Sequence, residues 1–391
     1  MPEPRGSDVY LSSLPTGLAP ALEAGGLRLY LKPVGLEPAG SPASRPLAGG
    51  PLSFSQCELL WRATARPSAV SRCRASVDAL EAWARGEGGS VARWFDAALK
   101  RLTRPRPGLA GLTFDRPALM GVLNVTPDSF SDGGQFLDPS VATAHGRKMM
   151  EAGADIIDVG GESTRPRSDG TAVEEELARV GPVVSALAGA GVPVSIDTRR
   201  ARVMGAALDA GAKLVNDVSA LTADPDSVAL IAARNAPVVL MHMRGEPATM
   251  HLKTDYAHAP LDVYDELAAR LEACVAAGIA AERVLLDPGL GFAKNSAQNA
   301  LVMADLALYH GLGCALAVGA SRKGLVSAVK RSSTPQERLP ASLAAALRAL
   351  EQGVQVLRVH DVAESAQALA VWRAVRGLPD RPAQGLAAAT G

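Results

Sequence analysis

The sequence predicts an α/β protein, a (β/α)8 TIM barrel preceded by a small N-terminal α+β domain or extension. Two observations predict the barrel. Eight short apolar runs alternate with longer stretches of helical period between Pro117 and Val359, and about 250 residues is typical of such barrels. Each apolar run also ends in, or leads into, polar side chains. We therefore place the N-terminal part at residues 1–115 and the barrel at 116–391.

The N-terminal part contains rough strand and helix patterns without recognisable chemistry. Leu27–Val34 and Leu52–Leu60 are predicted strands. Ser76–Arg85 and Ser90–Leu102 are predicted helices, each with a serine at or near its N-cap. The two prolines of Arg104–Gly108 indicate a linker. The role of this part stays open: it could cover the bottom of the barrel, extend a dimer interface, or be dispensable for catalysis.

The barrel part alternates strands with helices, as βα units do. The predicted strands are Ala118–Leu123, Ala154–Val159, Val192–Ile196, Lys213–Val215, Pro237–Met241, Arg283–Leu286, Ala315–Val318 and Val354–Leu357. The predicted helices include Val173–Ala188, Arg202–Ala210, Asp262–Ala277 and Pro340–Glu351. A doubly wound open sheet has the same periodicity, so closure of the barrel is an expectation.

The composition argues against a nucleic-acid-binding, membrane-spanning or secreted protein. Forty basic and forty acidic residues cancel, so no bulk charge indicates a nucleic-acid or membrane partner. No uninterrupted apolar run is long enough to span a bilayer, and the N-terminus lacks the features of a signal peptide. The four cysteines are far apart and form no CxxC pair. We therefore expect free thiols and a cytoplasmic protein.

The polar residues at the strand ends predict one shared pocket, because the carboxyl ends of barrel strands lie on one face. They are Asn124, Asp158 through Glu162, Asp197, Asn216-Asp217, His242, Asp287, Ser321-Arg322-Lys323, and Arg358 with His360. Taken singly, each has an ordinary explanation. Asn124 could satisfy the backbone of a turn, and each acid could cap a helix or form a structural ion pair.

Nine ordered segments allow a family to be named. They are LNVTPDSFSDGG, GADIIDVGGESTRP, SIDTRR, NDVSAL, LMHMRG, LDPGLGFAKN, GASRKG, ERLPASLAAA and LRVHDV. With them the chain resembles the dihydropteroate synthases of the pterin-binding barrel family, over Pro117–Leu369 but not over the first 115 residues. The resemblance implies condensation of a (7,8-dihydropterin-6-yl)methyl diphosphate with 4-aminobenzoate in tetrahydrofolate biosynthesis. These two small molecules are then the partners, and a homodimer is expected.

The resemblance also assigns roles to residues. It places the pterin ring against Asp197, Asn216 and Asp287, whose carboxylate and amide groups suit a ring edge of donors and acceptors. Lys323 caps the carbonyl and nitrogen edge of the ring, and Arg358 stacks on it or flanks it. Met241 and Phe292 line the same pocket. Asp197, Asp287, Lys323 and Arg358 are the expected catalytic residues, with the two acids stabilising a cationic pterin methylene after diphosphate leaves.

The second half of the expected site holds the diphosphate and the arylamine. Arg358, His360, Thr164, Arg165 and Asn124 converge on the diphosphate. Asn124 is the expected ligand of Mg²⁺, which binds through few protein oxygens and keeps several waters. Ser321 and the turn after it are expected to hold the benzoate carboxylate. No organic cofactor is expected, and sulfonamides, which resemble 4-aminobenzoate, are expected competitors.

Two loops, Val125–Gly134 and Gly160–Gly170, are expected to close over the substrates. Arg167 follows Thr164-Arg165-Pro166 where the family usually has glycine, which leaves the conformation of the second loop open. Two other functions are alternatives. A non-catalytic pterin-binding paralogue should have a damaged site, whereas the motif residues are intact. A methyltetrahydrofolate methyltransferase would need neither a diphosphate clamp nor the first loop.

Overall fold

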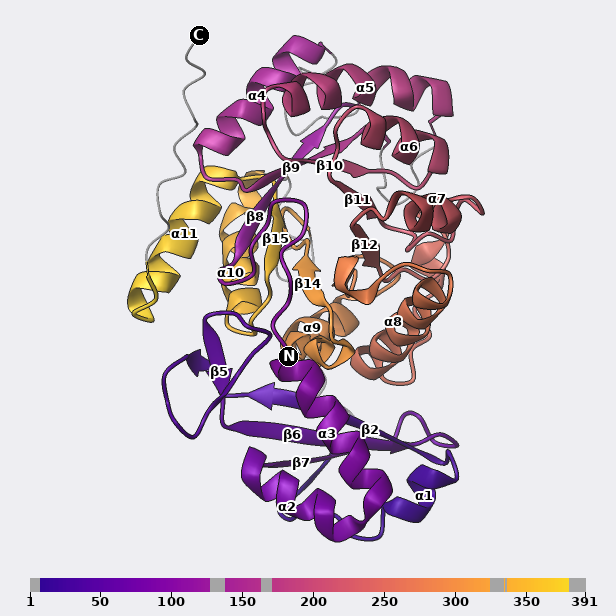
Figure 1. Cartoon of the computed structure of the whole chain (residues 1–391), viewed down its shortest axis with the longest axis vertical. Coiled ribbons are helices and arrows are strands. Elements are labelled where there is room, and N and C mark those ends of the chain that lie inside the picture. Colours follow the sequence, from indigo (N-terminus) through magenta and orange to yellow (C-terminus); the bar gives the residue numbers. More distant parts are fainter. Residues whose placement is uncertain (1–7, 127–137, 163–170, 324–333, 335, 380–391) are drawn as a thin grey trace.

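A closed barrel of eight parallel strands forms the larger part of the molecule (Figure 1). The computed structural model describes residues 8–126, 138–162, 171–323, 334 and 336–379. The strands are β8 (Ala118–Asn124), β9 (Ile156–Gly160), β10 (Val194–Asp197), β11 (Leu214–Asp217), β12 (Val238–Met241), β13 (Val284–Asp287), β14 (Ala315–Val318) and β15 (Val356–Val359). Because β15 pairs with β8, the barrel closes. The predicted TIM barrel is confirmed, and the open sheet is excluded.

Helices cover the outside of the barrel, as the βα periodicity predicts. They are α4 (Pro139–Glu151), α5 (Val173–Gly189), α6 (Ala201–Asp209), α7 (Ser227–Arg234), α8 (Ala259–Ala276), α9 (Ser296–Ala304), α10 (Leu339–Leu350) and α11 (Val362–Val375). Short 3-10 turns are η2 (Met250–Leu252), η3 (Ala281–Arg283), η4 (Leu306–Leu312) and η6 (Gln336–Arg338). Among the described residues, no helix is long and apolar enough to cross a membrane.

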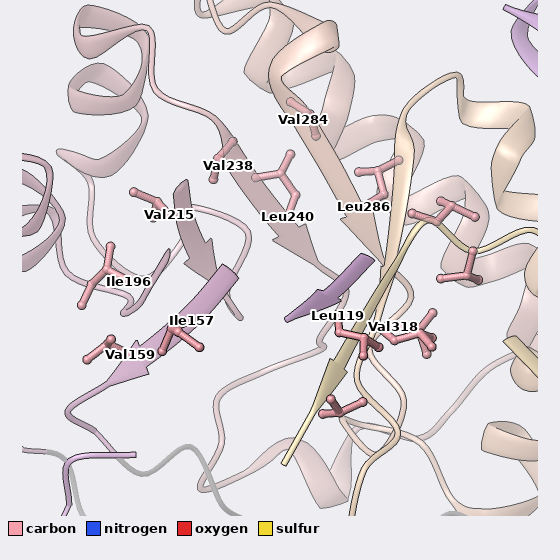
Figure 2. Close-up of a cluster of buried hydrophobic side chains, with 14 of the residues drawn as sticks. Leu119, Ile157, Val159, Ile196, Val215, Val238, Leu240, Val284, Leu286 and Val318 are labelled. Atoms are coloured by element: carbon pink, nitrogen blue, oxygen red, sulfur yellow. The ribbon is translucent and has the colours of Figure 1, made fainter. Parts of the chain in front are cut away.

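Side chains alternate between the two faces of each barrel strand, since the strand repeat is two residues. The outward-facing set packs against the helices and includes Ile157, Ile196, Val215 and Leu286 (Figure 2). The inward-facing set fills the lower half of the barrel. Its members are Ala118, Met120, Ile156, Leu214, Val239, Leu285, Ala315, Ala317 and Val356. The barrel interior is therefore a packed core rather than a channel.

The segment before β8 closes the bottom of the barrel. Leu109 and Leu112 pair by an isolated bridge, and both pack with Phe114 against the inward-facing apolar layer. The predicted linker Arg104–Gly108 leads into this plug. It is not a loose connection, because the buried Arg106 guanidinium donates to the backbone oxygens of Arg101, Arg104 and His310.

From residue 8 onward, the N-terminal region contains two small sheets and three helices. The larger sheet has the order β1-β7-β6-β2, and the smaller has the order β3-β5-β4. The strands are β1 (Val9–Leu11), β2 (Leu27–Val34), β3 (Glu37–Pro38), β4 (Arg45–Pro46), β5 (Leu52–Phe54), β6 (Gln56–Ala63) and β7 (Val70–Ser76). The helices are α1 (Ala19–Glu23), α2 (Val77–Glu87) and α3 (Gly89–Thr103). The mixture of strands and helices agrees with the predicted α+β character.

Details of this region correct the sequence prediction. Leu27–Val34 forms a strand with the predicted bounds, but Leu52–Leu60 is not one strand. It divides at Ser55 into β5 and β6, which belong to different sheets. Ser76 caps α2, since its Oγ accepts from the Ala79 amide at 3.2 Å. Ser90 makes no cap hydrogen bond, because the N-cap position of α3 is Gly88.

The larger N-terminal sheet lies between its own helices and the barrel (Figure 1). One face packs Leu29, Leu59 and Trp61 against α2 and α3. The other face packs Tyr30 and Leu60 against apolar residues of α8 and η4. Both faces are therefore covered, and the region is fixed against the flank of the barrel.

Candidate active site

Polar side chains lie directly above the inward-facing apolar layer of the barrel. Because side chains two residues apart share a face of a strand, the residue two positions after each inward apolar residue also points inward. The pairs are Ile156 with Asp158, Leu214 with Asn216, Val239 with Met241, Leu285 with Asp287, and Val356 with Arg358. The barrel thus changes from apolar to polar at its carboxyl end, where TIM-barrel active sites lie.

The last inward-facing residues of four neighbouring strands lie side by side, at the same height along the barrel. The pairing of β8, β9, β10 and β11 aligns Asn124 with Gly160, Gly160 with Asp197, and Asp197 with Asn216. Gly160 leaves a gap in this row. A Cβ there would lie 3.5 Å from Asn124 Oδ1 and 3.8 Å from Asp197 Oδ2. The missing side chain therefore leaves space that both oxygens border.

Arg358 joins two carboxylates at the centre of the site. Its Nε lies 2.6 Å from Asp158 Oδ2, and its Nη2 lies 2.6 Å from Asp197 Oδ2. Asn216 Nδ2 donates to the same Asp158 oxygen at 2.9 Å. The other oxygens, Oδ1 of Asp158 and Oδ1 of Asp197, are buried and have no hydrogen-bond partner among the described residues. Unsatisfied buried acceptors are costly, so a ligand with N–H donors would be stabilised here.

Burial and neighbouring charge act in opposite directions on these groups. Burial raises the pKa of Asp197, and the Arg358 guanidinium opposes that rise. The two carboxylates in turn raise the pKa of Arg358 above its usual value. At Asp197 burial outweighs the arginine, since the pKa of this carboxyl is raised to about 7, so a bound ligand with positive charge or N–H donors would favour its ionised form.

A second cluster lies across β13 and the turn after β14. Asp287 Oδ1 accepts from the Gly289 amide at 2.7 Å, and burial raises the pKa of Asp287 while Lys323 opposes the rise. Lys323 Nζ donates to the Leu290 carbonyl at 2.7 Å and lies 4.5 Å from the centre of the Phe292 ring.

Gly319 connects the two clusters. A Cβ at this position would lie 3.8 Å from both Arg358 Cδ and Lys323 Nζ. The arginine of the first cluster and the lysine of the second therefore border the same space. Met241 pairs in register with Asp287 and is buried beside it.

Ser321 and His360 meet at the edge of the site. Ser321 Oγ accepts from the His360 amide at 3.2 Å and lies 3.1 Å from His360 Nδ1. Arg322 pairs with Asp361 at 2.6 Å, which ties the turn after β14 to the end of β15. The turn after Ser321, which we expected to bind a carboxylate, lies mostly outside the described residues.

Thr164, Arg165 and Arg167 also lie outside the described residues, as do most of the two loops expected to close the site. The described ends of the second loop are held in place. Glu162 accepts from the Thr171 amide at 3.3 Å and pairs with both Arg199 and Arg200 at 3.0 Å. One carboxylate thus anchors both ends of that loop to the start of α6.

The structure corrects the expectation that all strand-end polar residues share one pocket. Asp217 accepts from the amides of Ser219 and Leu221, so it organises its own loop. His242 contacts Glu266 and Lys294 rather than the carboxylates of Asp158 and Asp197. Asp158 is the opposite case, because it lies at the centre of the site although the sequence motifs assigned it no role beyond its place at a strand end. The two-residue repeat from Ile156 was the signal that could have identified it.

Comparison with known proteins agrees with this geometry. Residues 120–360 match the family described as pterin binding enzyme. The chain belongs to the pterin binding enzyme family. A dihydropteroate synthase of Neisseria meningitidis is 44% identical over 267 residues, which cover 67% of this chain and 93% of that protein.

The chain is also similar to a longer relative and to a solved structure. A probable bifunctional folylpolyglutamate synthase/dihydropteroate synthase of Haloferax volcanii is 45% identical over 67% of this chain, but the match spans only 31% of that longer protein. A solved structure of the Xanthomonas albilineans dihydropteroate synthase in complex with 7,8-dihydropteroate is 41% identical, with a TM-score of 0.63. It covers 70% of this chain, and all of that chain is matched.

Proposed function

We propose that this chain is a dihydropteroate synthase, which joins (7,8-dihydropterin-6-yl)methyl diphosphate to 4-aminobenzoate and releases diphosphate. The observation that supports this most directly is the pair of unpartnered buried oxygens on Asp158 and Asp197 beside Arg358. A pterin edge carries amino and ring N–H donors that match such acceptors. Membership of the pterin binding enzyme family supports the same ligand.

The reaction begins when the bond between the pterin methylene and the bridging phosphate oxygen breaks, and the electron pair leaves with diphosphate. The positive charge is shared between the methylene and the ring. Asp197 and Asp287, in their ionised forms, stabilise it electrostatically. The amine lone pair of 4-aminobenzoate then forms the new C–N bond, and the nitrogen loses a proton to solvent.

Cationic groups and hydrogen-bond donors of the chain stabilise the leaving diphosphate. Arg358 and His360 at the end of β15 belong to this clamp, and Thr164 and Arg165 are assigned to it by motif. Lys323 binds the carbonyl and nitrogen edge of the pterin, from its position over Phe292. Met241 and Phe292 line the ring, Asn216 contacts its edge, and Ser321 binds the carboxylate of 4-aminobenzoate.

A magnesium ion is part of this proposal. The space beside Gly160 that Asn124 Oδ1 borders fits an ion that takes oxygen ligands and retains water. Asn124 would hold the ion, which would supply positive charge next to the diphosphate. No group of three or more His, Cys, Asp or Glu side chains in the described ranges could hold a metal ion, so the fit depends on a single amide oxygen and the substrate.

We also propose a homodimer in the cytoplasm. All four cysteines are buried and unpaired, which supports a reducing compartment. The oligomeric state can be measured by light scattering.

The activity is tested by diphosphate release from purified protein with both substrates, with and without Mg²⁺. Turnover that requires both substrates supports the proposal, whereas pterin binding without turnover would indicate a non-catalytic paralogue. Competition by a sulfonamide against 4-aminobenzoate would support the arylamine site.

A further inference from the structure

Lys294 is a buried lysine beside the site, and it takes no part in the reaction proposed for this chain. It follows β13 and is 8% exposed. Its ammonium lies 3.0 Å from His242 Nδ1, 2.9 Å from the Gly289 carbonyl and 3.0 Å from the Phe292 carbonyl. A lysine ammonium has three N–H donors. In the ammonium form all three are used by the protein itself; burial lowers the pKa of Lys294 to about 7, so this form predominates below that pH.

The contact with Glu266 fixes the tautomer of His242. Because an ionised carboxylate only accepts, Nδ1 of the neutral ring accepts from Lys294, and the ring hydrogen is on Nε2. That nitrogen lies 2.9 Å from Glu266 Oε2, and Arg244 holds the same carboxylate. Burial and the Lys294 charge lower the pKa of His242 to about 4. The ring stays neutral near pH 7, so it acts as a fixed hydrogen-bond bridge.

Lys294 holds both ends of the turn at residues 289–292. This turn has left-handed backbone, with φ of 67° at Gly289 and 83° at Gly291, and the next residue, Ala293, has a φ of 47° that is strained for a residue with a Cβ. Its Leu290 carbonyl and Phe292 ring are the contacts of Lys323. The turn therefore lies between Lys294 on one side and the proposed pterin-binding lysine on the other.

We propose that Lys294, oriented by His242, is a positioning residue that fixes the turn 289–292 and thereby sets Lys323 for recognition of the pterin. The chain of contacts runs from Glu266 on α8 through His242 and Lys294 to the turn. Lys294 touches no substrate, because its donors all face the protein. This inference rests on the function proposed above, since it assumes that Lys323 binds the ring edge.

Two substitutions of His242 separate this role from general stability. In His242→Asn, the amide oxygen can take the place of Nδ1 and accept from Lys294. In His242→Gln, the amide reaches the position of Nε2 and Glu266, while no acceptor remains at the position of Nδ1. Lys294→Met removes the donor itself at similar volume. Lys213→Met, at an exposed position before β11, is the control.

The full-length variants are compared by calorimetry with (7,8-dihydropterin-6-yl)methyl phosphate, which cannot release diphosphate. We expect about a tenfold or greater loss of pterin affinity in Lys294→Met and His242→Gln, the size of a lost hydrogen bond to a charged group. His242→Asn should bind within about threefold of wild type, because its bridge to Lys294 persists. In the assay, the KM for the pterin diphosphate should rise and that for 4-aminobenzoate should not.

Other results would overturn the inference. One is unchanged pterin affinity in folded Lys294→Met, or in folded His242→Gln if the first variant does not fold. Another is equal weakening of both substrates together with a lower melting temperature in every His242 variant, which indicates only a structural contact. If wild type binds the pterin phosphate but gives no turnover, the proposed activity fails, and the binding differences still decide the role of Lys294.

Discussion

Asp197 shows how one carboxylate can serve recognition without holding the fold together. Its Oδ2 pairs with Arg358, while its Oδ1 has no partner in the described structure. Arg358 keeps a second carboxylate, Asp158, when Asp197 is removed. Loss of Asp197 should therefore damage ligand binding more than stability.

We expect Asp197→Ala to lower pterin affinity by roughly 10- to 100-fold, since a hydrogen bond to a charged group contributes about 1.5–3 kcal/mol. Calorimetry with the pterin phosphate measures the effect. Asp209→Ala, which removes an exposed pair with Arg234, is the control. Wild-type affinity in Asp197→Ala would exclude Asp197 from ring recognition.

Lys323 should limit activity in alkaline solution. Burial lowers its pKa to about 8, and the charge of Asp287 opposes part of that shift. The ammonium is present below this pKa and is lost as the pH rises through it. Because kcat/KM reports the free enzyme, kcat/KM for the pterin diphosphate should fall above about pH 8. A guanidinium stays charged there, so kcat/KM of Lys323→Arg should not fall above about pH 8. An unchanged fall in this variant would mean that another group causes it.

At the scale of elements, the turn after β13 depends on Gly289. Its φ is 67°, and a Cβ would lie 2.0 Å from the His242 carbonyl oxygen. Gly278 is a natural control, because its φ is 97° but the nearest atom would be 3.9 Å away. Both substitutions by alanine impose backbone strain, whereas only the first also forces two loops apart.

We expect Gly278→Ala to reduce the free energy of unfolding by about 1–3 kcal/mol, the usual cost of a left-handed non-glycine residue. Gly289→Ala should cost more and should also weaken pterin binding, because the turn carries the contacts of Lys323. Urea denaturation and calorimetry measure the two effects. Equal losses of stability, with pterin binding intact, would mean that the close approach at Gly289 is not required.

The strands of the barrel could be predicted from sequence because they are buried on both faces and therefore form apolar runs. Ala315–Val318 was placed correctly, and the other strands differ by one to a few residues at their ends. The break at Ser55 could not be placed, because an apolar run does not show where a chain changes sheets. The two-residue strands β3 and β4 are too short to carry a pattern.

The candidate site was predictable only in part. Motifs identified Asp197, Asp287, Lys323 and Arg358, and the structure brings them to one end of the barrel. The inward or outward direction of a strand-end residue depends on register, which the runs alone left undetermined. That is why the strand-end pattern placed Asp158 and Asp217 in the same pocket, although only Asp158 points into it.

At the scale of the whole molecule, the N-terminal region and the barrel meet through matched charges. Arg62 of β6 pairs with Asp262 at 2.6 Å and with Asp265 at 2.8 Å, both on α8. Tyr30 donates to Asp265 at 2.9 Å. Such partners are up to 273 residues apart in the chain, so no local pattern could predict them. They give the region one orientation on the barrel, because a shifted arrangement would leave buried charges unpaired.

Substitution of Asp305 tests this interface most directly. It is 1% exposed, precedes η4, and accepts from Lys32 at 2.7 Å and from Arg72 at 3.2 Å. Asp305→Ala would leave two buried cations without this counter-ion. Removing one partner of a buried pair costs about 3–5 kcal/mol, so the urea midpoint should fall markedly.

The matched control is Glu282→Ala, which removes an exposed ion pair with Arg104 between the same two regions. It should cost less than about 1 kcal/mol. Because Asp305 lies outside the site cluster, turnover of the Asp305→Ala protein that remains folded should stay near wild type. Equal midpoints for the two variants would show that the buried charges do not hold the N-terminal region in place. Lost turnover at full stability would instead connect that region to the active site.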